Sequence, residues 1–301
     1  MKKQSTNHLF MIEPASFYAN PETLETNAYQ IDEHEPPEEI YARALQEFRT
    51  FRDTLIEAGV IITAAKGLPE CPDMVFPNWA STHREIGGDP TLFLYPMLNN
   101  NRQKERDPAL VEMFKRLYPN TEDWTGMESE GNALESTASI VMDRVNKNGY
   151  AALSPRTDKN LARLWCADMG YALETFQTRS HTGIPVYHTD CVMWIGTTLA
   201  GICTEAIIEE DRERILAKLK STHEVVEFTS SQLRAFCGNA LEVIGKNNQK
   251  FLAMSTAAYE ALEPAQKTLI LQHFNGIIHE PLPTLEKYGG GSARCMLMEL
   301  F

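Results

Sequence analysis

A repeated pentapeptide is the feature that most constrains how this chain can fold. The segment Gly131–Glu135, Gly-Asn-Ala-Leu-Glu, recurs unchanged at Gly238–Glu242. His188 lies 53 residues after the end of the first copy and 54 before the end of the second, and Cys295 lies 53 residues beyond the second. Asp73 precedes the end of the first copy by a looser 62 residues. This spacing indicates structural repeats, in a chain long enough for five units.

Hydrophobic periodicity predicts helices that alternate with short β-like segments. The clearest helix, residues 38–57, follows two prolines and repeats apolar side chains at three- and four-residue steps. Asn148-Gly149 is typical of a hairpin turn. The alternation predicts an α/β fold, and without a Ser/Pro/Gly-rich linker we expect one domain over residues 1–301. The other predicted helices are 108–117, 158–169, 210–219 and 257–274, and the predicted strands are 60–63, 74–76, 91–95, 139–145, 150–153, 185–192, 251–254 and 293–300.

Equivalent positions of repeats arranged around an axis converge on that axis. If each unit is a strand–strand–helix piece, three carboxylates, an imidazole and a thiol meet at one spot. These groups belong to Asp73, Glu135, His188, Glu242 and Cys295.

Charge and cysteine usage exclude several classes of function. The chain has 28 basic and 41 acidic residues, a net charge of -13, which disfavours nucleic acid and anionic membrane surfaces as partners. The N-terminal apolar run is too short for a signal peptide, so a cytoplasmic protein is expected. None of the six cysteines forms a C-x-x-C pair or neighbours a histidine at zinc-ligand spacing, so neither a metal nor another cofactor is predicted.

Cys295 is the candidate nucleophile. It follows three consecutive glycines, Gly289 to Gly291, which let the backbone approach a ligand closely. A nearby His188 would lower the pKa of the thiol, protonate a departing amine and then activate water. Glu135 would orient or polarise His188.

Carboxylates around a thiol suit a planar substrate rich in nitrogen. Guanidinium and urea groups present several N–H donors, which carboxylates accept two at a time. Asp73 and Asp190 are the candidates for that task. Arg102 and Arg156 are the candidates for binding a substrate carboxylate, with surface salt bridges as the alternative interpretation of both arginines.

With these residues assembled, the sequence resembles the pentein or amidinotransferase superfamily. The resemblance covers residue 70 to the end and lies in Pro72-Asp73-x-Val75-Phe76, Leu134-Glu135, Ser154-x-Arg156-Thr157, the His188 motif and Cys295. It implies a five-bladed α/β propeller with pseudo-fivefold symmetry. It also implies that Cys295 is the nucleophile, His188 the acid–base group and Glu135 its partner. Asp73 would hold the substrate head, and Arg102 and Arg156 its carboxylate.

Further motifs look like the arginine-deiminase-related branch that includes ornithine-forming citrulline hydrolases. They are Phe76-Pro-Asn-Trp79-x-Ser-Thr-His83, Tyr95-Pro-Met97, Asn27-x-Tyr29-Gln30 and Gly290-Gly-Ser-Ala-Arg-Cys295-Met. After Phe76, the acidic positions of the methylarginine hydrolases are neutral here. Asn78 offers both a donor and an acceptor and so favours a neutral ureido group, whereas Asp190 favours arginine, because arginine deiminases carry Asp at that position.

The predicted function is hydrolysis of the ureido group of citrulline to ornithine, carbon dioxide and ammonia, through a covalent thio intermediate on Cys295. The alternatives with the same site are an arginine or methylarginine deiminase and an amidinotransferase; a catalytically inactive binding protein is a further one. The predicted partner is a small amino-acid substrate, and a homo-oligomer is possible.

Overall fold

The computed structural model describes residues 3–84 and 88–301. Within these residues the strands form five three-stranded sheets, in the orders β15-β1-β2, β3-β4-β5, β6-β7-β8, β11-β10-β9 and β12-β13-β14. The strands are β1 His8–Glu13, β2 Ile61–Lys66, β3 Ala80–His83, β4 Thr91–Leu94, β5 Asn120–Asp123, β6 Val141–Asp143, β7 Asn148–Ala152, β8 Ala172–Phe176, β9 Met193–Ile195, β10 Leu199–Ile202, β11 Glu224–Glu227, β12 Leu241–Ile244, β13 Lys250–Ser255, β14 Gly276–Glu280 and β15 Met298–Glu299.

Each sheet has one long helix between its central and outer strands. These helices are α1 Pro37–Glu57, α3 Pro108–Leu117, α5 Lys159–Asp168, α7 Glu209–Lys220 and α10 Pro264–His273. The shorter helices are α2 Asn100–Gln103, α4 Ser136–Ser139, α6 Thr189–Val192, α8 Ser230–Arg234, α9 Thr256–Ala261 and α11 Pro283–Gly289, and the 3-10 turns are η1 Thr125–Glu130, η2 Thr204–Ala206, η3 Lys246–Asn248 and η4 Ala293–Met296.

All five sheets repeat one connectivity. The first strand runs antiparallel to the central strand, and the central strand runs parallel to the outer one through the long helix, as in β6, β7, α5 and β8. In the remaining sheet the antiparallel strand comes from the other end of the chain, because β15 pairs with β1 through Leu9 opposite Glu299. The unit is therefore the strand–strand–helix piece that the sequence period predicted, completed by an outer strand.

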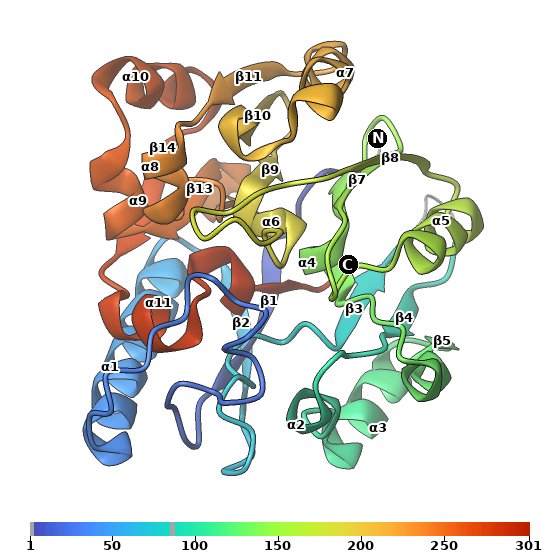
Figure 1. The fold of residues 1–301 in the computed structure, drawn as a ribbon, viewed down its shortest axis with the longest axis vertical. Coiled ribbons are helices and arrows are strands. Elements are labelled where there is room, and N and C mark those ends of the chain that lie inside the picture. The colour runs from blue at the N-terminus through green and yellow to red at the C-terminus, as the bar shows by residue number, and fades with distance from the viewer. Residues whose placement is uncertain (1–2, 85–87) are drawn as a thin grey trace.

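The sheets form a closed ring. Contacts between β15 and β3, α4 and β3, β6 and β9, β9 and β12, and α1 and β14 join each sheet to the next and the last to the first. Figure 1 shows the five units around a common centre, with the long helices outside. The predicted α/β propeller class is confirmed.

Helix α1 shows why the long helices form where they do. Pro37 occupies its first turn, where a missing backbone N–H costs nothing, and acidic residues follow at the positive end of the helix dipole. Its buried side chains recur at three- and four-residue steps and pack in one core cluster with residues of α11 and β14. They are Ile40, Ala44, Phe48, Phe51 and Leu55.

Most predicted helices are confirmed to within two residues, and α3 has the predicted bounds. The predicted helix 257–274 is wrong as one element, because it is divided into α9 and α10 before Pro264, whose ring cannot follow a helical turn. The predicted strands at 74–76 and 185–192 are wrong as well. The first segment is a series of turns, and the second ends in the helical turn α6.

The hairpin between β6 and β7 is present, but its predicted turn is misplaced. Asn148 and Gly149 belong to β7, where they pair with Asp143 and Met142. The turn consists of residues 144–147, and Lys147 adopts a left-handed φ of 58°. The Asp143 carboxylate accepts hydrogen bonds from the backbone and side chain of Asn146. These bonds stabilise the observed turn, which ends just before the predicted pair Asn148-Gly149.

Glu242 does not reach the centre of the ring, so the prediction that its carboxylate meets the other four repeat residues there is wrong. It lies within β12, where its carboxylate accepts hydrogen bonds from Ser5 Oγ at 2.8 Å, Thr197 N at 2.7 Å and Thr197 Oγ1 at 2.5 Å. Glu135, by contrast, comes before the first strand of its sheet. Glu242 therefore ties the N-terminal segment to the sheets of β9 and β12.

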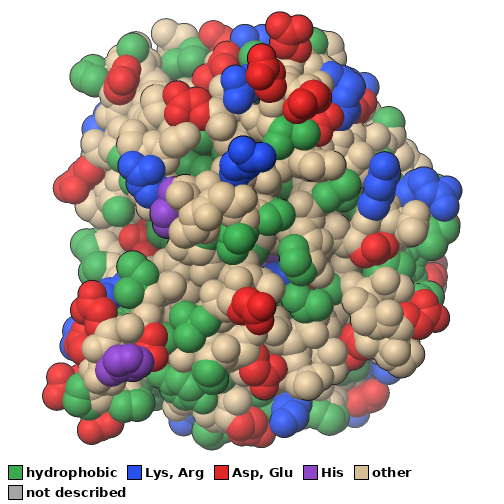
Figure 2. Space-filling view, in the orientation of Figure 1, with side chains coloured by type: hydrophobic (Ala, Val, Ile, Leu, Met, Phe, Trp, Pro, Cys, Tyr) green, Lys and Arg blue, Asp and Glu red, His purple; other side chains and the backbone are tan. Residues whose placement is uncertain are grey.

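Two surface properties bear on partners. Within the described residues no helix is long and apolar enough to cross a membrane. The face in Figure 2 shows Lys and Arg interspersed with Asp and Glu rather than gathered in one basic patch.

Replacing Glu242 should destabilise the fold. Glu242→Ala removes the acceptor for the buried Ser5 and the partly buried Thr197, and we expect the free energy of unfolding to fall by about 3 kcal/mol, measured by urea denaturation. Glu213→Ala, at an exposed position of α7, is the matched control and should change it by less than about 0.5 kcal/mol. Equal effects of the two substitutions would show that the hydrogen bonds of Glu242 with Ser5 and Thr197 do not stabilise the fold.

Candidate active site

The site is built from the segments that lead into the first strand of each sheet. Asp73 precedes β3, Glu135 precedes α4 and β6, and His188 precedes α6 and β9. Asn239 comes two residues before β12, and Cys295 lies in η4 just before β15. All five side chains are buried. Because the sheets form a ring, these equivalent segments reach one central region.

A small cavity occupies part of this region. The predicted residues Asp73, Asn78, Arg102, Arg156, His188 and Cys295 line it, together with Asn27, Phe76, Tyr187, Gly289 and Gly291. Apart from Glu242, eight residues were singled out from the sequence, and six of them face one cavity. Of the other two, Glu135 lies behind His188, and Asp190 contacts Cys295 from another side.

His188 and Glu135 form a buried pair. His188 Nε2 lies 2.7 Å from Glu135 Oε2. Burial alone would raise the pKa of Glu135, but the Arg156 guanidinium, the hydrogen bond with His188 and Arg102 together lower it to about 2. The two guanidinium groups lie 3.8 and 3.9 Å from the same Oε2. Glu135 is thus a permanent carboxylate at working pH, which fixes the orientation of the imidazole.

The thiol of Cys295 sits among hydrogen-bond donors. Its pKa is lowered first by a hydrogen bond from Cys191, against the opposing effect of burial, and further by Ser292 and Asn239. Asn239 Nδ2 lies 3.1 Å from the sulfur, and Asn239 Oδ1 accepts from the backbone N–H of Arg294 at 3.0 Å. One amide therefore both positions the turn that carries Cys295 and stabilises its thiolate.

The glycines before Cys295 are needed for close packing. Gly290 has a left-handed φ of 62°, and a Cβ there would lie 2.5 Å from Asn27 Nδ2. Asn27 Nδ2 donates to the carbonyl of Gly289 at 3.2 Å, and Tyr187 donates its hydroxyl hydrogen to the carbonyl of Gly290 at 2.5 Å. Segments far apart in the sequence thus hold the glycine loop at the cavity wall.

Asp73 offers an unused acceptor. Its Oδ2 accepts hydrogen bonds from Asn20 Nδ2 at 2.7 Å and Thr23 Oγ1 at 3.3 Å, whereas its Oδ1 is buried without a partner among the described residues. Burial raises the pKa of Asp73, and Arg102 and Arg156 offset only part of that rise. A ligand N–H would satisfy the remaining oxygen.

Arg102 and Arg156 are buried, so the alternative of surface salt bridges is wrong for both. Arg102 binds Glu105 through two contacts, 2.8 and 3.0 Å, and donates to the carbonyl of Phe76 at 2.6 Å. Arg156 donates to Thr26 Oγ1 at 2.9 Å and lies 5.0 Å from the centre of the Tyr187 ring.

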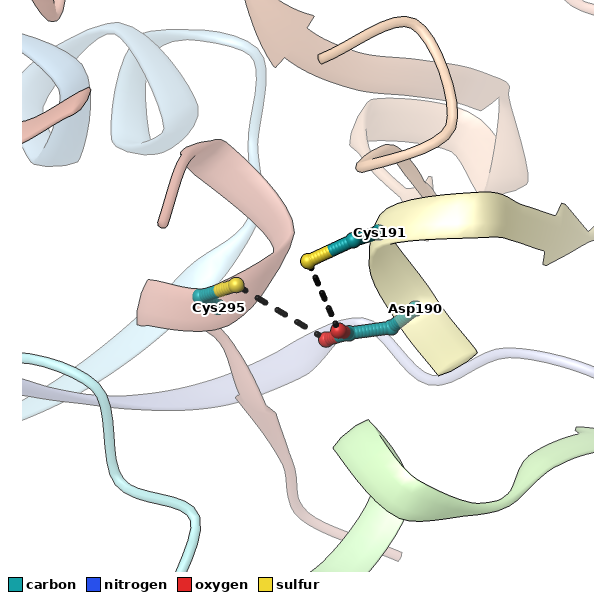
Figure 3. A group of neighbouring side chains, drawn as sticks. All are labelled: Asp190, Cys191 and Cys295. Atoms are coloured by element: carbon teal, nitrogen blue, oxygen red, sulfur yellow. Dashed lines mark hydrogen bonds between the residues drawn. The ribbon is translucent and has the colours of Figure 1, made fainter. Parts of the chain in front are cut away.

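Asp190 lies beside the sulfur and not on the cavity wall. Its two oxygens are each 3.8 Å from a thiol sulfur, Oδ2 from Cys295 and Oδ1 from Cys191 (Figure 3). It lines a second cavity with Arg294 and Glu299. Burial and the neighbouring Cys295 raise its pKa well above the ordinary value, and the Cys295 thiol is placed to donate to its Oδ2.

Sequence reasoning missed two residues that contact the sulfur. Asn239 belongs to the second copy of the repeated pentapeptide, so the repeat did point to this segment. In that copy, however, the Asn and not the Glu contacts the sulfur of Cys295. Cys191 gave no such signal, although Asp190, Cys191 and Cys295 form the one group in the described residues whose metal-binding atoms all lie within 4.8 Å of one another.

Solved structures with the same fold include enzymes of arginine metabolism. The N-terminal domain of ArgZ, described as an arginine dihydrolase from the ornithine–ammonia cycle in cyanobacteria and bound to substrate as a cysteine-to-serine variant, matches with a TM-score of 0.77 at 15% identity, covering 97% of both chains. A cysteine-to-alanine variant of AgrE with L-arginine matches with a TM-score of 0.77 at 15% identity, over 98% of this chain and 40% of AgrE.

A third structure is a histidine-to-glycine variant of dimethylarginine dimethylaminohydrolase, present as an adduct with S-methyl-L-thiocitrulline. It matches with a TM-score of 0.66 at 16% identity and covers 100% of both chains. A search of curated protein sequences finds no significant match.

The sequence itself matches one family model, described as N,N dimethylarginine dimethylhydrolase, eukaryotic, over residues 13–301. This match spans nearly the whole chain, and the structural matches place the same fold among the penteins. The chain therefore belongs to the eukaryotic-type N,N dimethylarginine dimethylhydrolase family, within the pentein superfamily.

Proposed function

We propose that the protein is a cysteine-dependent hydrolase that cleaves the ureido group of citrulline to ornithine, carbon dioxide and ammonia. The observation that carries this proposal is one buried cavity lined by both Cys295 and His188, with His188 held by Glu135 at 2.7 Å. A lowered thiol pKa, an oriented imidazole and an unpartnered carboxylate oxygen are what attack on a nitrogen-rich carbon requires.

In the proposed mechanism the Cys295 thiolate adds to the ureido carbon. His188 protonates the ornithine nitrogen as the C–N bond breaks, which leaves a carbamoyl group on the sulfur. His188 then takes a proton from water, the resulting hydroxide attacks the carbamoyl carbon, and the C–S bond breaks. The released carbamate decomposes to carbon dioxide and ammonia.

Substrate binding follows from the remaining residues on the cavity wall. Asp73 Oδ1 accepts an N–H of the ureido group, because among the described residues that line the cavity it is the acceptor that is buried without a partner. Arg156 is better suited than Arg102 to bind the substrate carboxylate. The Nε and Nη2 atoms of the Arg102 guanidinium already donate to Glu105 in two short contacts, whereas the Arg156 guanidinium donates to the hydroxyl of Thr26.

The neutral ureido group suits this cavity better than a guanidinium ion for two reasons. Asn78 Oδ1 is 3.4 Å from Arg102 Nη1, so the amide nitrogen of Asn78 is left to donate to a carbonyl oxygen, which citrulline has and arginine lacks. Burial raises the pKa of Asp73, and a guanidinium ion in the cavity would need this carboxylate ionised.

Arginine-type substrates are the second candidate, and the comparisons favour them. ArgZ is described as an arginine dihydrolase, AgrE was captured with L-arginine, and the family description names dimethylarginine. The same nucleophile and acid–base pair would serve them.

Incubation with single substrates tests the proposal. L-Citrulline should give ornithine and ammonia, quantified by chromatography, while L-arginine and N,N-dimethylarginine react at least about tenfold more slowly in kcat/KM, the effect of one mismatched buried polar contact. Release of citrulline from arginine, with citrulline itself inert, would replace the first candidate by the second.

Cys295→Ser should lower kcat by more than roughly 10³-fold with either substrate, because it removes the nucleophile. Cys203→Ser, at a buried cysteine with no place in the proposed site, is the matched control. Turnover by Cys295→Ser close to that of the control would exclude covalent catalysis by this residue.

Asn78→Asp should change which substrate is preferred. The substitution removes the donor for the ureido oxygen and adds an acceptor, so the ratio of kcat/KM for citrulline to that for arginine should fall by about tenfold or more. An unchanged ratio would show that Asn78 does not contact the group that is attacked.

Asn239→Ala should shift the reactivity of Cys295 to higher pH. A thiol with a lowered pKa is a thiolate above that pKa, and removing a donor to the thiolate raises it, by roughly one to two pH units. The measurement is the pH dependence of Cys295 alkylation by iodoacetamide, read by peptide mass. Asn132→Ala changes the same position in the other copy of the pentapeptide and should leave the midpoint of the alkylation curve unchanged. The same midpoint for both variants would contradict the contact between Asn239 and the sulfur of Cys295.

A further inference from the structure

Cys191 is a second buried thiol directly beside Cys295. The sulfur atoms of Cys191 and Cys295 and a carboxylate oxygen of Asp190 all lie within 4.8 Å of one another. Figure 3 shows the two sulfurs pointing toward each other, with the carboxyl group of Asp190 bridging them below. The proposed hydrolysis uses Cys295 and gives Cys191 no covalent role.

The pair comes from two different parts of the ring. Cys191 lies in α6, the turn that follows His188, and Cys295 lies in η4 before the last strand. Other buried cysteines are engaged differently: Cys71 donates to the carbonyl of Asn101 and Cys237 to that of Ala258. The fold therefore brings these two thiols together across 104 positions of sequence, between elements that are each packed in place.

The two thiols differ in access and in charge. Cys295 lines the cavity, whereas Cys191 does not, so a small molecule that enters meets Cys295 first. Burial raises the pKa of Cys191 well above its ordinary value, while hydrogen bonds lower the pKa of Cys295. The partner on the cavity wall is thus the nucleophilic thiolate, and the enclosed one is a neutral thiol held against it.

We infer that Cys295 and Cys191 form a reversible disulfide when a hydroperoxide enters the cavity, with Cys295 as the thiol that is oxidised first and Cys191 as the thiol that resolves it. The inference rests on the positions of the two sulfurs and requires no assignment of substrate. The two sulfurs lie within 4.8 Å of each other, and closing the bond to about 2.05 Å requires rotation of the two side chains and a shift of the η4 turn.

The reaction is balanced by the peroxide. The Cys295 thiolate attacks one peroxide oxygen, the O–O bond breaks, and hydroxide leaves, so Cys295 becomes a sulfenic acid. The sulfur of Cys191 then attacks the sulfur of Cys295, the S–O bond breaks, and water leaves with the proton lost by Cys191. Two electrons pass from the two sulfur atoms to hydrogen peroxide, which ends as one molecule of water and one hydroxide ion, and the hydroxide takes a proton from solvent.

Asp190 is placed to assist the second step. While Cys295 is a thiolate, its charge contributes to keeping the Asp190 carboxyl protonated. Sulfenic acid at Cys295 carries no charge, which removes that contribution. The Cys191 thiol already donates to Asp190 Oδ1, 3.8 Å from its sulfur, so this oxygen is placed to receive the proton of Cys191 as its sulfur attacks.

The consequence is protection of the nucleophile. A sulfenic acid without a neighbouring thiol is oxidised further to sulfinic acid, which common thiol reductants do not reverse. With Cys191 beside it, Cys295 should instead be stored as a disulfide that dithiothreitol reduces.

The test is peptide mass mapping of the full chain after treatment with hydrogen peroxide. We expect a cross-linked peptide that contains Cys191 and Cys295 and lacks two hydrogen atoms, and its disappearance after dithiothreitol, with Cys295 thiol titre restored. This readout on the unaltered protein depends neither on a variant that must fold nor on any enzymatic activity. Accumulation of sulfinic acid at Cys295 without the cross-link would overturn the inference.

Variants make the test specific. In Cys191→Ala, peroxide should convert Cys295 to sulfinic acid, and at least about tenfold less Cys295 thiol should be recovered by dithiothreitol than in the unaltered protein. Cys203→Ala is the matched control and should retain full recovery. Recovery in Cys191→Ala equal to that of the control would show that another group resolves the sulfenic acid, and would overturn the role given to Cys191.

Discussion

The pairing of β15 with β1 is the constraint on which the rest of the structure depends. Four sheets are assembled from consecutive segments, but the sheet of β1 takes its antiparallel strand from residues 298–299. The backbone N–H of Leu300 donates to the carbonyl of His8, and Thr6 Oγ1 donates to the carbonyl of Leu300, so the residue that follows this short strand is held through both of its backbone polar groups. Without it the ring has an open edge, and Cys295 has no fixed position.

Once the ring is closed, the site is a set of equivalent positions occupied by different chemistry. A carboxylate, a second carboxylate, an imidazole, an amide and a thiol come from five segments of one type, and burial would penalise several of their charges. The fold meets that cost with buried partners: Arg156 and Arg102 for Glu135, Glu105 for Arg102, and Asn239 for Cys295. Catalytic groups and their counter-charges are thus one buried network.

The sequence was informative where a local pattern determines structure. Periodic apolar residues with proline at the start located α1 and α3, and the 53-residue interval located Glu135, His188 and Cys295. The sequence was misleading where identical residues lie at different distances from the strand that follows them. The second copy of the pentapeptide contributes Asn239 instead of Glu242, because β12 begins two residues after the Asn while α4 separates Glu135 from β6. Nothing in the sequence placed Cys191 next to Cys295, since that contact is set by packing between α6 and η4.

The closing strand also determines when the thiol becomes reactive. Its lowered pKa arises from Cys191, Ser292 and Asn239, and two of these belong to other units of the ring. Because β15 follows every other described strand along the chain, its pairing with β1 spans most of the sequence and carries the large entropy cost of a long loop. A chain still being synthesised or partly unfolded therefore carries Cys295 as an ordinary thiol, so the reactivity of this one atom reports completion of the entire fold.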